Sequence, residues 1–485
     1  MRQAPAERPR SPTLPRWGAQ RRSSPGELPS SSPRRWDTVS FLTLWLVLLY
    51  LITARQVIGP LGSLGPPATL LAMAAAVLWI GAWLHPASGL VRARHPMRPL
   101  LLVYAWYAVI SFTVAMLRPL TEIELMGAQR ALVTTFAMVG IALLVADGVT
   151  HLDGIVRILR RLLWLGAVLA VLGVLEFAYG VRLQPRIPGL SLDSLPSIAV
   201  RDGLNRPRGT ALHPIEFSVV VAALLPIAIH FALYDDSGAR RRVAAVVVVL
   251  LGAAVPVGLS RSGVLALVTA LLVLAVGWNR RRLLNAAALM LAGLTALWLL
   301  SPRLSSAVAG LFREPQESYS IQARVDRVPD IMSFIGARPW FGLGNGTWGV
   351  EDYFLVDNEV WVTTLETGVV GLSLTLALIV AGIVLGRGVR RSPFADEATA
   401  HLGRAVAASI AGLGVSLATF DAFHYRILTG TLFLMLGISG ALWRLSPPAR
   451  NADAASGPGG TGGSRAPGHR REGSVTRHAD GVPPS

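Results

Sequence analysis

Hydrophobic residues occur along this chain in long runs that short polar segments separate. Runs of about 17–25 apolar residues are long enough to cross a hydrocarbon layer of about 30 Å as helices. Inside lipid the backbone polar groups must be satisfied within the segment, so each run predicts a helix and not a strand. Twelve runs qualify: Val39–Ala54, Pro67–Leu84, Pro99–Leu117, Ala131–Ala146, Leu162–Gly180, Pro214–Tyr234, Val243–Leu259, Gly263–Trp278, Leu283–Leu300, Trp361–Gly386, Ala405–Phe423 and Ile427–Trp443.

The pattern therefore predicts an all-α polytopic membrane protein with ten to twelve transmembrane helices, and twelve is our reading. The seventh and eighth runs are separated only by "SRSG", so a re-entrant pair is the alternative there. Composition agrees with a membrane protein, because 52% of the residues are hydrophobic and only 15% are charged. Cysteine is absent, which excludes disulfides, thiolate metal sites and cysteine nucleophiles.

Arginine placement predicts the orientation, since the chain has no lysine. With a cytoplasmic N-terminus, sixteen arginines fall in inside loops: Arg92, Arg94, Arg98, Arg157, Arg160, Arg161, Arg240, Arg241, Arg242, Arg280, Arg281, Arg282, Arg387, Arg390, Arg391 and Arg404. The short outside loops hold five: Arg55, Arg118, Arg130, Arg261 and Arg426. Cytoplasmic loops carry the excess of positive charge, so both termini are predicted to be cytoplasmic.

The two ends of the chain are predicted to be disordered cytoplasmic tails, residues 1–37 and 446–485. They are rich in Pro, Gly, Ser and Arg and have too little apolar surface to offset the entropy of ordering. The basic first tail can rest on anionic lipid, which explains part of the net charge of +17 without any nucleic acid partner. The membrane domain is predicted to occupy residues 38–445.

Two outside connections, residues 181–213 and 301–360, are much longer than the others. Connections beyond about 15 residues in a compact protein usually have a function. Together these two contain ten arginines: Arg182, Arg186, Arg201, Arg206, Arg208, Arg303, Arg313, Arg324, Arg327 and Arg338. Guanidinium groups bind phosphate through a planar fork, so the cluster predicts an anionic ligand on the outer face. Taken singly, each arginine is better explained by solvation of its loop or contact with lipid head groups.

Within this set the diphosphate-binding candidates are Arg206, Arg208, Arg261, Arg324 and Arg327. Arg261 stands between two serines in "GLSRSGVLALV", where snorkelling toward the interface is the competing explanation. Arg324 and Arg327 lie in "SIQARVDRVPDIMSFIGARPWFGLGNG", whose apolar spacing predicts an amphipathic helix in the interface. Pro329 is expected near its middle and could divide it, and "GLGNG" supplies turns and close backbone approach.

Acidic and imidazole side chains stand at the mouths of two predicted spans. In "RPRGTALHPIEF", His213 and Glu216 precede a long apolar run, and both are candidates for handling a proton. In "VDNEVWVTTLETGVVGLSL", Asp357 is a third candidate, with Asn358 and Glu366 in supporting positions. A carboxylate inside a span is costly, so Glu366 either functions or pairs with an arginine of Arg201–Arg208 or with Arg261.

At four places the sequence resembles the O-antigen ligase and polymerase superfamily of bacterial membrane enzymes. These are "RPRGTALHPIEFS", "SRSG", "RVDRVPDIMSFIGARPWFGLGNGTW" and "DNEVWVTTLETGVVGL", all within residues 200–380. The resemblance implies a helical fold similar to that of lipid-phosphate-sugar glycosyltransferases. It also implies a bacterial cytoplasmic membrane, an extracytoplasmic active site, an undecaprenyl-diphosphate-linked glycan as donor, and a glycan or cell-envelope acceptor.

The implied reaction is attack by an acceptor hydroxyl on the donor sugar, with the lipid diphosphate leaving toward the arginines. The family usually has His-Asn where this chain has Asp357 and Asn358. Either Asp357 or His213 is then the base, and a polymerase fits at least as well as a ligase. Neither a metal nor another cofactor is expected, since arginines can supply the positive charge, although Asp357 and Glu216 leave a cation site conceivable. The main alternative is a transporter or flippase for a lipid-linked or anionic glycan, since twelve spans suit many permeases.

Overall fold

The computed structural model describes residues 37–85, 92–184, 186–192, 197–313, 326–349, 351–393 and 395–446. The predicted tails therefore lie outside the described residues, apart from Asp37 and Ser446. Every predicted span coincides with a helix, and the fold is all-helical apart from two short β-ribbons. The helices are α1 Thr38–Leu51, α2 Pro67–Leu84, α3 Met97–Met116, α4 Glu122–Gly148, α5 Leu152–Tyr179, α6 Pro214–Tyr234, α7 Gly238–Val257, α8 Arg261–Ala275, α9 Arg280–Leu300, α10 Pro302–Arg313, α12 Val328–Ala337, α13 Glu359–Gly388, α14 Glu397–Ser416 and α15 Arg426–Leu445.

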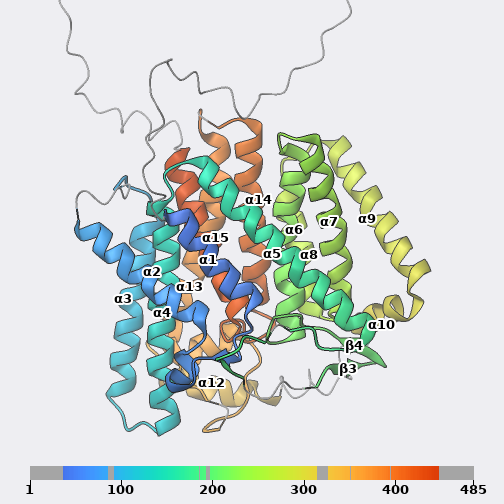
Figure 1. Cartoon of the computed structure of the whole chain (residues 1–485). Coiled ribbons are helices and arrows are strands. Elements are labelled where there is room, and N and C mark those ends of the chain that lie inside the picture. Colours follow the sequence, from blue (N-terminus) through green and yellow to red (C-terminus); the bar gives the residue numbers. More distant parts are fainter. Residues whose placement is uncertain are drawn as a thin grey trace, which may run out of the picture.

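The long helices run alongside one another, up and down a single bundle (Figure 1). The chain enters α1 and leaves α15 at one end of the bundle, which we call the terminal end. The opposite end, called the loop end, carries the connections from α5 to α6 and from α9 to α13. Two antiparallel ribbons lie there, β1 (Gln56–Val57) with β2 (Ser191–Leu192) and β3 (Ala199–Arg201) with β4 (Leu204–Arg206). Both long connections therefore meet at the same end, as the alternation of spans predicts.

Eight helices in the described part of the chain are long and apolar enough to cross a membrane: α2, α3, α4, α5, α6, α9, α13 and α15. Of the remaining four predicted spans, α1 and α8 have only 14 and 15 residues. The other two, α7 and α14, contain polar residues that lower their hydropathy, including Arg240–Arg242 in α7 and Glu397 in α14. The number twelve therefore stays a prediction, as do the membrane side of each end and the likeness to lipid-phosphate-sugar glycosyltransferases.

Two helices begin about ten residues earlier than their apolar runs suggest. At the start of α4, the Thr121 hydroxyl accepts a hydrogen bond from the Glu124 backbone N–H, and the Glu124 carboxylate accepts one from Thr121. This reciprocal cap fixes the helix start well before Ala131. The first turns of α5 carry Arg157, Arg160 and Arg161, which hydropathy excludes although they are good helix formers.

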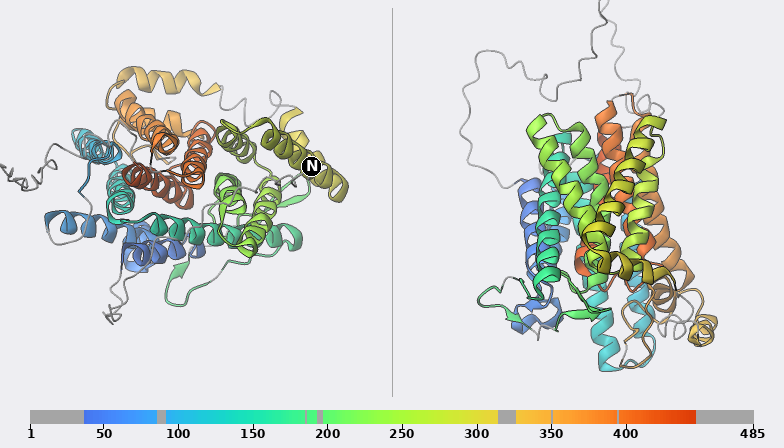
Figure 2. Two further views of the ribbon diagram at one scale, coloured as in Figure 1. Left: turned by 90° about the horizontal axis from the view of Figure 1, so that it is seen from above. Right: turned by 90° about the vertical axis from the view of Figure 1, so that its right-hand side faces the viewer.

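The centre of the bundle is formed by α6, α14 and α15. Within the most apolar window of α15, 89% of the residues are buried, and in α6 the share is 78%. In α9 it is 0%, and this helix stands at the edge of the bundle (Figure 2). The core therefore lies along α6 and α15, and α9 belongs to the periphery.

Four polar side chains form a buried network of ion pairs and hydrogen bonds at the terminal end. Asp147 of α4 is fully buried and accepts hydrogen bonds from Trp79 Nε1 at 2.9 Å and from Arg98 Nη2 at 2.6 Å. Arg98 Nε adds a bond of 3.0 Å, and His95 Nε2 lies 2.8 Å from the same carboxylate. The contacts join α2, α3 and α4. A buried carboxylate is tolerable only with such partners.

Replacing Asp147 by alanine should destabilise the protein by about 3–5 kcal/mol, because Arg98 would remain buried without its partner carboxylate. Thermal unfolding in detergent micelles measures the effect. The matched control is Asp153→Ala, which removes an exposed carboxylate from the same end of the bundle and should change stability by less than about 0.5 kcal/mol. Equal unfolding midpoints for the two variants would contradict the assignment of Asp147 as an anchor.

Candidate active site

The β3–β4 ribbon places Arg206 beside the turn between α7 and α8. Its Nε donates to the carbonyl of Gly258 at 3.5 Å, three residues before Arg261. Burial, and secondarily the charge of Arg201, lower the pKa of Arg206 below its usual value. The guanidinium nevertheless stays charged at neutral pH, because an arginine starts near 12.5. The ribbon therefore presents a partly desolvated cation to the loop end.

Arg208 is held rigidly in the next turn of the chain. Its guanidinium donates from Nη1 to the Leu212 carbonyl at 2.9 Å and from Nη2 to the Ser197 carbonyl at 3.2 Å. Its backbone N–H donates to the Glu176 carboxylate at 3.0 Å. Burial, followed by the nearby charges of Arg182 and Arg55, lowers the pKa of Arg208 to about 10. The local excess of positive charge is thus built from three arginines, of which sequence analysis selected only Arg208.

His213 caps α6 and remains neutral. Its Nδ1 accepts a hydrogen bond from the backbone N–H of Ile215 at 3.2 Å. Burial, and then the positive charges of Arg206 and Arg208, lower its pKa to about 4, against a smaller raising effect of Asp357. A neutral imidazole that accepts at Nδ1 carries its proton on Nε2. In this arrangement the ring presents a donor, and not a base, to any ligand.

Asp357 approaches His213 from the other long connection. It is half-buried and precedes Asn358, whose side-chain oxygen caps α13 by accepting from the Val360 N–H at 2.9 Å. The Asn358 amide also donates to the Ala418 carbonyl at 3.0 Å, which ties the start of α13 to the end of α14. The cap thus holds Asp357 at the loop end, where its charge influences both His213 and Tyr425.

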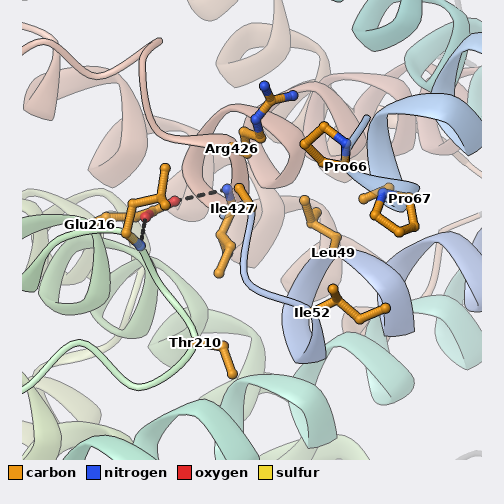
Figure 3. Close-up of a pocket in the computed structure, with 11 residues that line it drawn as sticks. Leu49, Ile52, Pro66, Pro67, Thr210, Glu216, Arg426 and Ile427 are labelled. Carbon is orange, nitrogen blue, oxygen red and sulfur yellow. Dashed lines mark hydrogen bonds between the residues drawn. The ribbon is translucent and has the colours of Figure 1, made fainter. Parts of the chain in front are cut away.

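The Glu216 carboxylate is fully buried and occupied by backbone donors. It accepts from the N–H groups of Leu212 at 2.7 Å, Ile427 at 2.8 Å and Leu428 at 3.3 Å. The contacts join the N-termini of α6 and α15, as the dashed lines in Figure 3 show. This geometry gives Glu216 a structural contact between two helix N-termini, and its proton-handling role stays a prediction.

Glu366 organises the glycine-rich segment that follows α12. Its carboxylate accepts from the Trp348 N–H at 3.1 Å, and no ion pair with an arginine is found for it among the described residues. The backbone of α13 is interrupted at Gly368, with φ 64° and ψ −172°. The segment docks into this interruption through bonds from Val369 N–H to the Pro339 carbonyl (2.8 Å) and from Gly344 N–H to the Glu366 carbonyl (2.7 Å).

The glycines in this segment allow an unusually close approach. A Cβ on Gly342, whose φ is 64°, would lie 2.5 Å from the Leu365 carbonyl oxygen. The expected role of "GLGNG" in turns and backbone contact is confirmed here. Pro329 lies in the first turn of α12, where proline begins a helix because its missing N–H needs no partner there. The first part of the predicted amphipathic helix lies outside the described residues, so its division at Pro329 stays a prediction.

A cavity at the loop end is lined by arginines. It has a volume of about 940 Å³ and is bounded by Arg201, Leu204, Arg261, Arg303 and Ser306, with neighbouring residues of the β3–β4 ribbon and α10. The Nε of Arg261 is buried and has no hydrogen-bond partner in the described parts of the chain. Ligand sites commonly occupy about 300–1,000 Å³, so this cavity has the right size for a phosphate-bearing ligand.

A second cleft lies beside Glu216 and is far smaller. Its volume is about 10 Å³, and it is bounded by Leu49, Pro67, Thr210 and Arg426 among others (Figure 3). A water molecule needs about 10–15 Å³, so the cleft has no room for a sugar. Of the two cavities, only the arginine-lined one can hold a substrate.

The predicted arginines fall into three locations. Arg206 and Arg208 lie beside His213, and Arg206 connects them to the cavity that contains Arg261. Arg327 lies apart: its Nη1 donates to the Leu355 carbonyl at 2.8 Å, two residues before Asp357. Arg324 lies outside the described residues. Arg201 and Arg303 of the cavity were among the ten loop arginines but not among the diphosphate candidates. Tyr425 and Arg426 at the start of α15 were not selected from the sequence.

A family model of the O-antigen ligases matches residues 246–376, from α7 into α13. This segment contains Arg261, Arg303, Asp357 and Glu366, whereas His213 lies outside it. The match confirms the resemblance to the O-antigen ligase and polymerase superfamily and supports an O-antigen ligase- or polymerase-like role in surface polysaccharide assembly. Together with the long apolar helices, it supports a multi-pass membrane protein. No curated protein matches the chain.

Acidification should destabilise the protein through His213. Because the folded-state pKa is about 4 against an ordinary 6.5, the unfolded chain binds the proton first as the pH falls through this window. Relative to His213→Asn, the wild type should lose on the order of 2 kcal/mol between pH 6.5 and 4, and only a small part of that amount above pH 6.5. Asparagine keeps the cap acceptor and does not titrate. Thermal unfolding at a series of pH values tests this, and parallel stability curves would contradict it.

Proposed function

We propose that the chain is a glycosyltransferase that moves a glycan from an undecaprenyl-diphosphate carrier to an acceptor hydroxyl on the extracytoplasmic side of the bacterial cytoplasmic membrane. The observation that carries the proposal is the cavity of about 940 Å³ with Arg201, Arg261 and Arg303 in its wall. Arg206 extends this positive surface toward His213 and Asp357. The loop end would then face outward.

The arginines would act on the leaving group. As the bond between the anomeric carbon and the carrier breaks, negative charge develops on the diphosphate oxygens. Fixed guanidinium groups in a site of restricted water stabilise that charge without reorganising during the reaction. Arg261 has an unpartnered Nε for this purpose, and Arg206 donates only one hydrogen bond to another described residue. Both are therefore assigned to the diphosphate, with Arg208 beside them.

Asp357 is assigned as the base, because the His213 Nδ1 already accepts a hydrogen bond and its Nε2 carries the proton. The acceptor oxygen forms the new bond to the anomeric carbon, the carbon–diphosphate bond breaks, and the acceptor proton passes to the Asp357 carboxylate. The His213 Nε2–H would orient the acceptor or the departing oxygen. Glu216, Asn358, Glu366 and Arg327 are assigned to positioning, since each contacts backbone. Metal independence stays a prediction.

A transporter is the second candidate, and the interruption of α13 at Gly368 is the feature that favours it. Transporters bind their substrates at interrupted helices near the middle of the bilayer. Here, however, the segment around Pro339–Gly344 fills the interruption with backbone hydrogen bonds. Proteoliposomes separate the two candidates: a glycosyltransferase joins donor to acceptor on one leaflet, and a transporter moves solute across the bilayer.

Asp357→Asn should lower the transfer rate by about 10²–10⁴-fold, because the variant lacks the proton acceptor. His213→Asn should retain transfer within about tenfold, since it preserves the cap and removes only an orienting donor. Glu351→Gln, an exposed position of the same connection, serves as the control and should be unchanged. The measurement is glycan transfer from a lipid-linked donor in proteoliposomes. Loss in His213→Asn with retention in Asp357→Asn would reverse the assignment.

Arg261→Ala should lower transfer by about 10²–10³-fold with the protein still folded in the membrane, by analogy with removal of one preorganised donor elsewhere. Arg261→Lys should recover part of the rate, because lysine restores the charge without the planar fork. Arg313→Ala, an exposed arginine at the end of α10, is the matched control. A transfer rate equal to that of the wild type in Arg261→Ala would contradict the assignment of Arg261 to the diphosphate.

A further inference from the structure

The helix α9 is apolar on every side and buried on none. The successive residues Leu289, Met290 and Leu291 are 75%, 59% and 66% exposed. Consecutive helical residues point about 100° apart, so these three sample all sides of the helix. The side of α9 that faces the rest of the bundle is therefore as open as the side that faces away.

Both ends of α9 are nevertheless attached. At the terminal end, Arg282 donates to the Tyr234 hydroxyl and to the Glu397 carboxylate, each at 3.0 Å. At the loop end, Leu297 packs against the apolar cluster formed by Val257, Leu259, Leu304 and Ala307, which joins α10 to the turn between α7 and α8. A helix fixed at its ends and open along its middle leaves a window between itself and the α7–α8 pair.

The neighbouring helices α7 and α8 also carry exposed apolar side chains. On α7, Val246 and Val249 are 67% and 70% exposed, and on α8 Leu272 is 64% exposed. A Cβ on Gly252 of α7 would meet open space. The neighbouring surfaces are thus suited to contact with a hydrocarbon chain, because they are not covered by protein.

The window leads to the arginine-lined cavity. Ala307 and Leu204 belong both to the cavity wall and to the apolar cluster at the end of α9. Apolar surface is therefore continuous from the middle of α9 to the position of Arg261 and Arg303. A molecule that follows it has a hydrocarbon chain in the window and an anionic head at the arginines.

Charge favours a diphosphate over the single phosphate of an ordinary phospholipid. Arg201, Arg261 and Arg303 line the cavity, and the only acidic residue in its described wall is Asp202, which pairs with Arg201 across 3.9 Å. Three cations against one largely exposed carboxylate match two phosphates better than one. We propose that the window between α9 and the α7–α8 pair admits the polyprenyl chain of the lipid diphosphate donor, an inference that rests on the proposed glycosyl transfer.

The absence of cysteine from the sequence gives a direct test. Leu289→Cys, Met290→Cys and Leu291→Cys each provide a single thiol, which is labelled with a bulky maleimide in proteoliposomes. Transfer is then measured with two diphosphate-linked donors, one on an eleven-unit polyprenyl chain and one on a two-unit chain. We expect at least one labelled position, the one facing the window, to lose tenfold or more in kcat/KM with the long donor only. Positions facing away, and all unlabelled variants, serve as matched controls.

Three results would overturn the proposal. The first is unchanged transfer of the long donor at all three labelled positions, and the second is equal loss with both donors. The third is that labelling halves the mass of the protein assembly, measured in nanodiscs. That result would assign α9 to an interface between two copies of the chain. Failure of the proposed function looks different, because the unlabelled protein would then transfer neither donor.

A second measurement does not depend on transfer. An environment-sensitive fluorophore on the window-facing cysteine should respond saturably to undecaprenyl diphosphate. It should respond at least tenfold less to the same concentration of phosphatidylglycerol. An equal response to both lipids would show a groove for bulk phospholipid and overturn the assignment.

Discussion

The buried carboxylate of Glu216 is the contact on which the loop end depends. Helix N-termini leave backbone N–H groups without partners and carry partial positive charge. Glu216 joins two such termini, because it belongs to the first turn of α6 and accepts from Ile427 and Leu428 of α15. With this carboxyl group in place, His213 stands at one terminus and Tyr425 at the other, with their rings 5.9 Å apart. Burial, and secondarily the charge of Glu216, raise the pKa of the Tyr425 hydroxyl. The phenol therefore stays protonated beside the candidate site.

The arginines at the loop end differ in the hydrogen bonds that the protein gives their guanidinium groups. Arg208 is committed to the carbonyls of Leu212 and Ser197, so its charge is fixed in place within the protein. Arg261 reaches the large cavity with a buried Nε that no described residue satisfies. A buried donor without a partner is expensive unless a ligand or water completes it. Arg208 therefore contributes a positive charge that protein carbonyls hold in place, and Arg261 offers a donor to a ligand.

Hydropathy predicted the helices and their order, because membrane helices are determined by local composition, whereas the orientation expected from arginine placement stays a prediction. The site was only partly predictable. The motif "RPRGTALHPIEF" placed Arg206, Arg208 and His213 together correctly, since they are close in sequence. Nothing local distinguishes Glu216 as the residue that joins α6 to α15, because its partners in α15, Ile427 and Leu428, are more than 200 residues away. The inclusion of Arg303 likewise depends on how α10 folds back against the α7–α8 turn, which is a tertiary contact.

The exposed position of α9 also could not be predicted from the sequence. Its sequence is as apolar as that of α6, and hydropathy treats the two alike. In a membrane no hydrophobic driving force brings helices together, so packing is decided by side-chain fit and polar contacts. For α9 the described polar contacts lie at the terminal end, and packing at the loop end is limited to Leu297 and the cluster around Leu304. A helix held in this way keeps its length exposed to lipid while holding α10, and with it Arg303, in the cavity wall. The placement of a cation at the loop end is therefore coupled to the window proposed beside α9, and the proposed lipid-linked donor would use both.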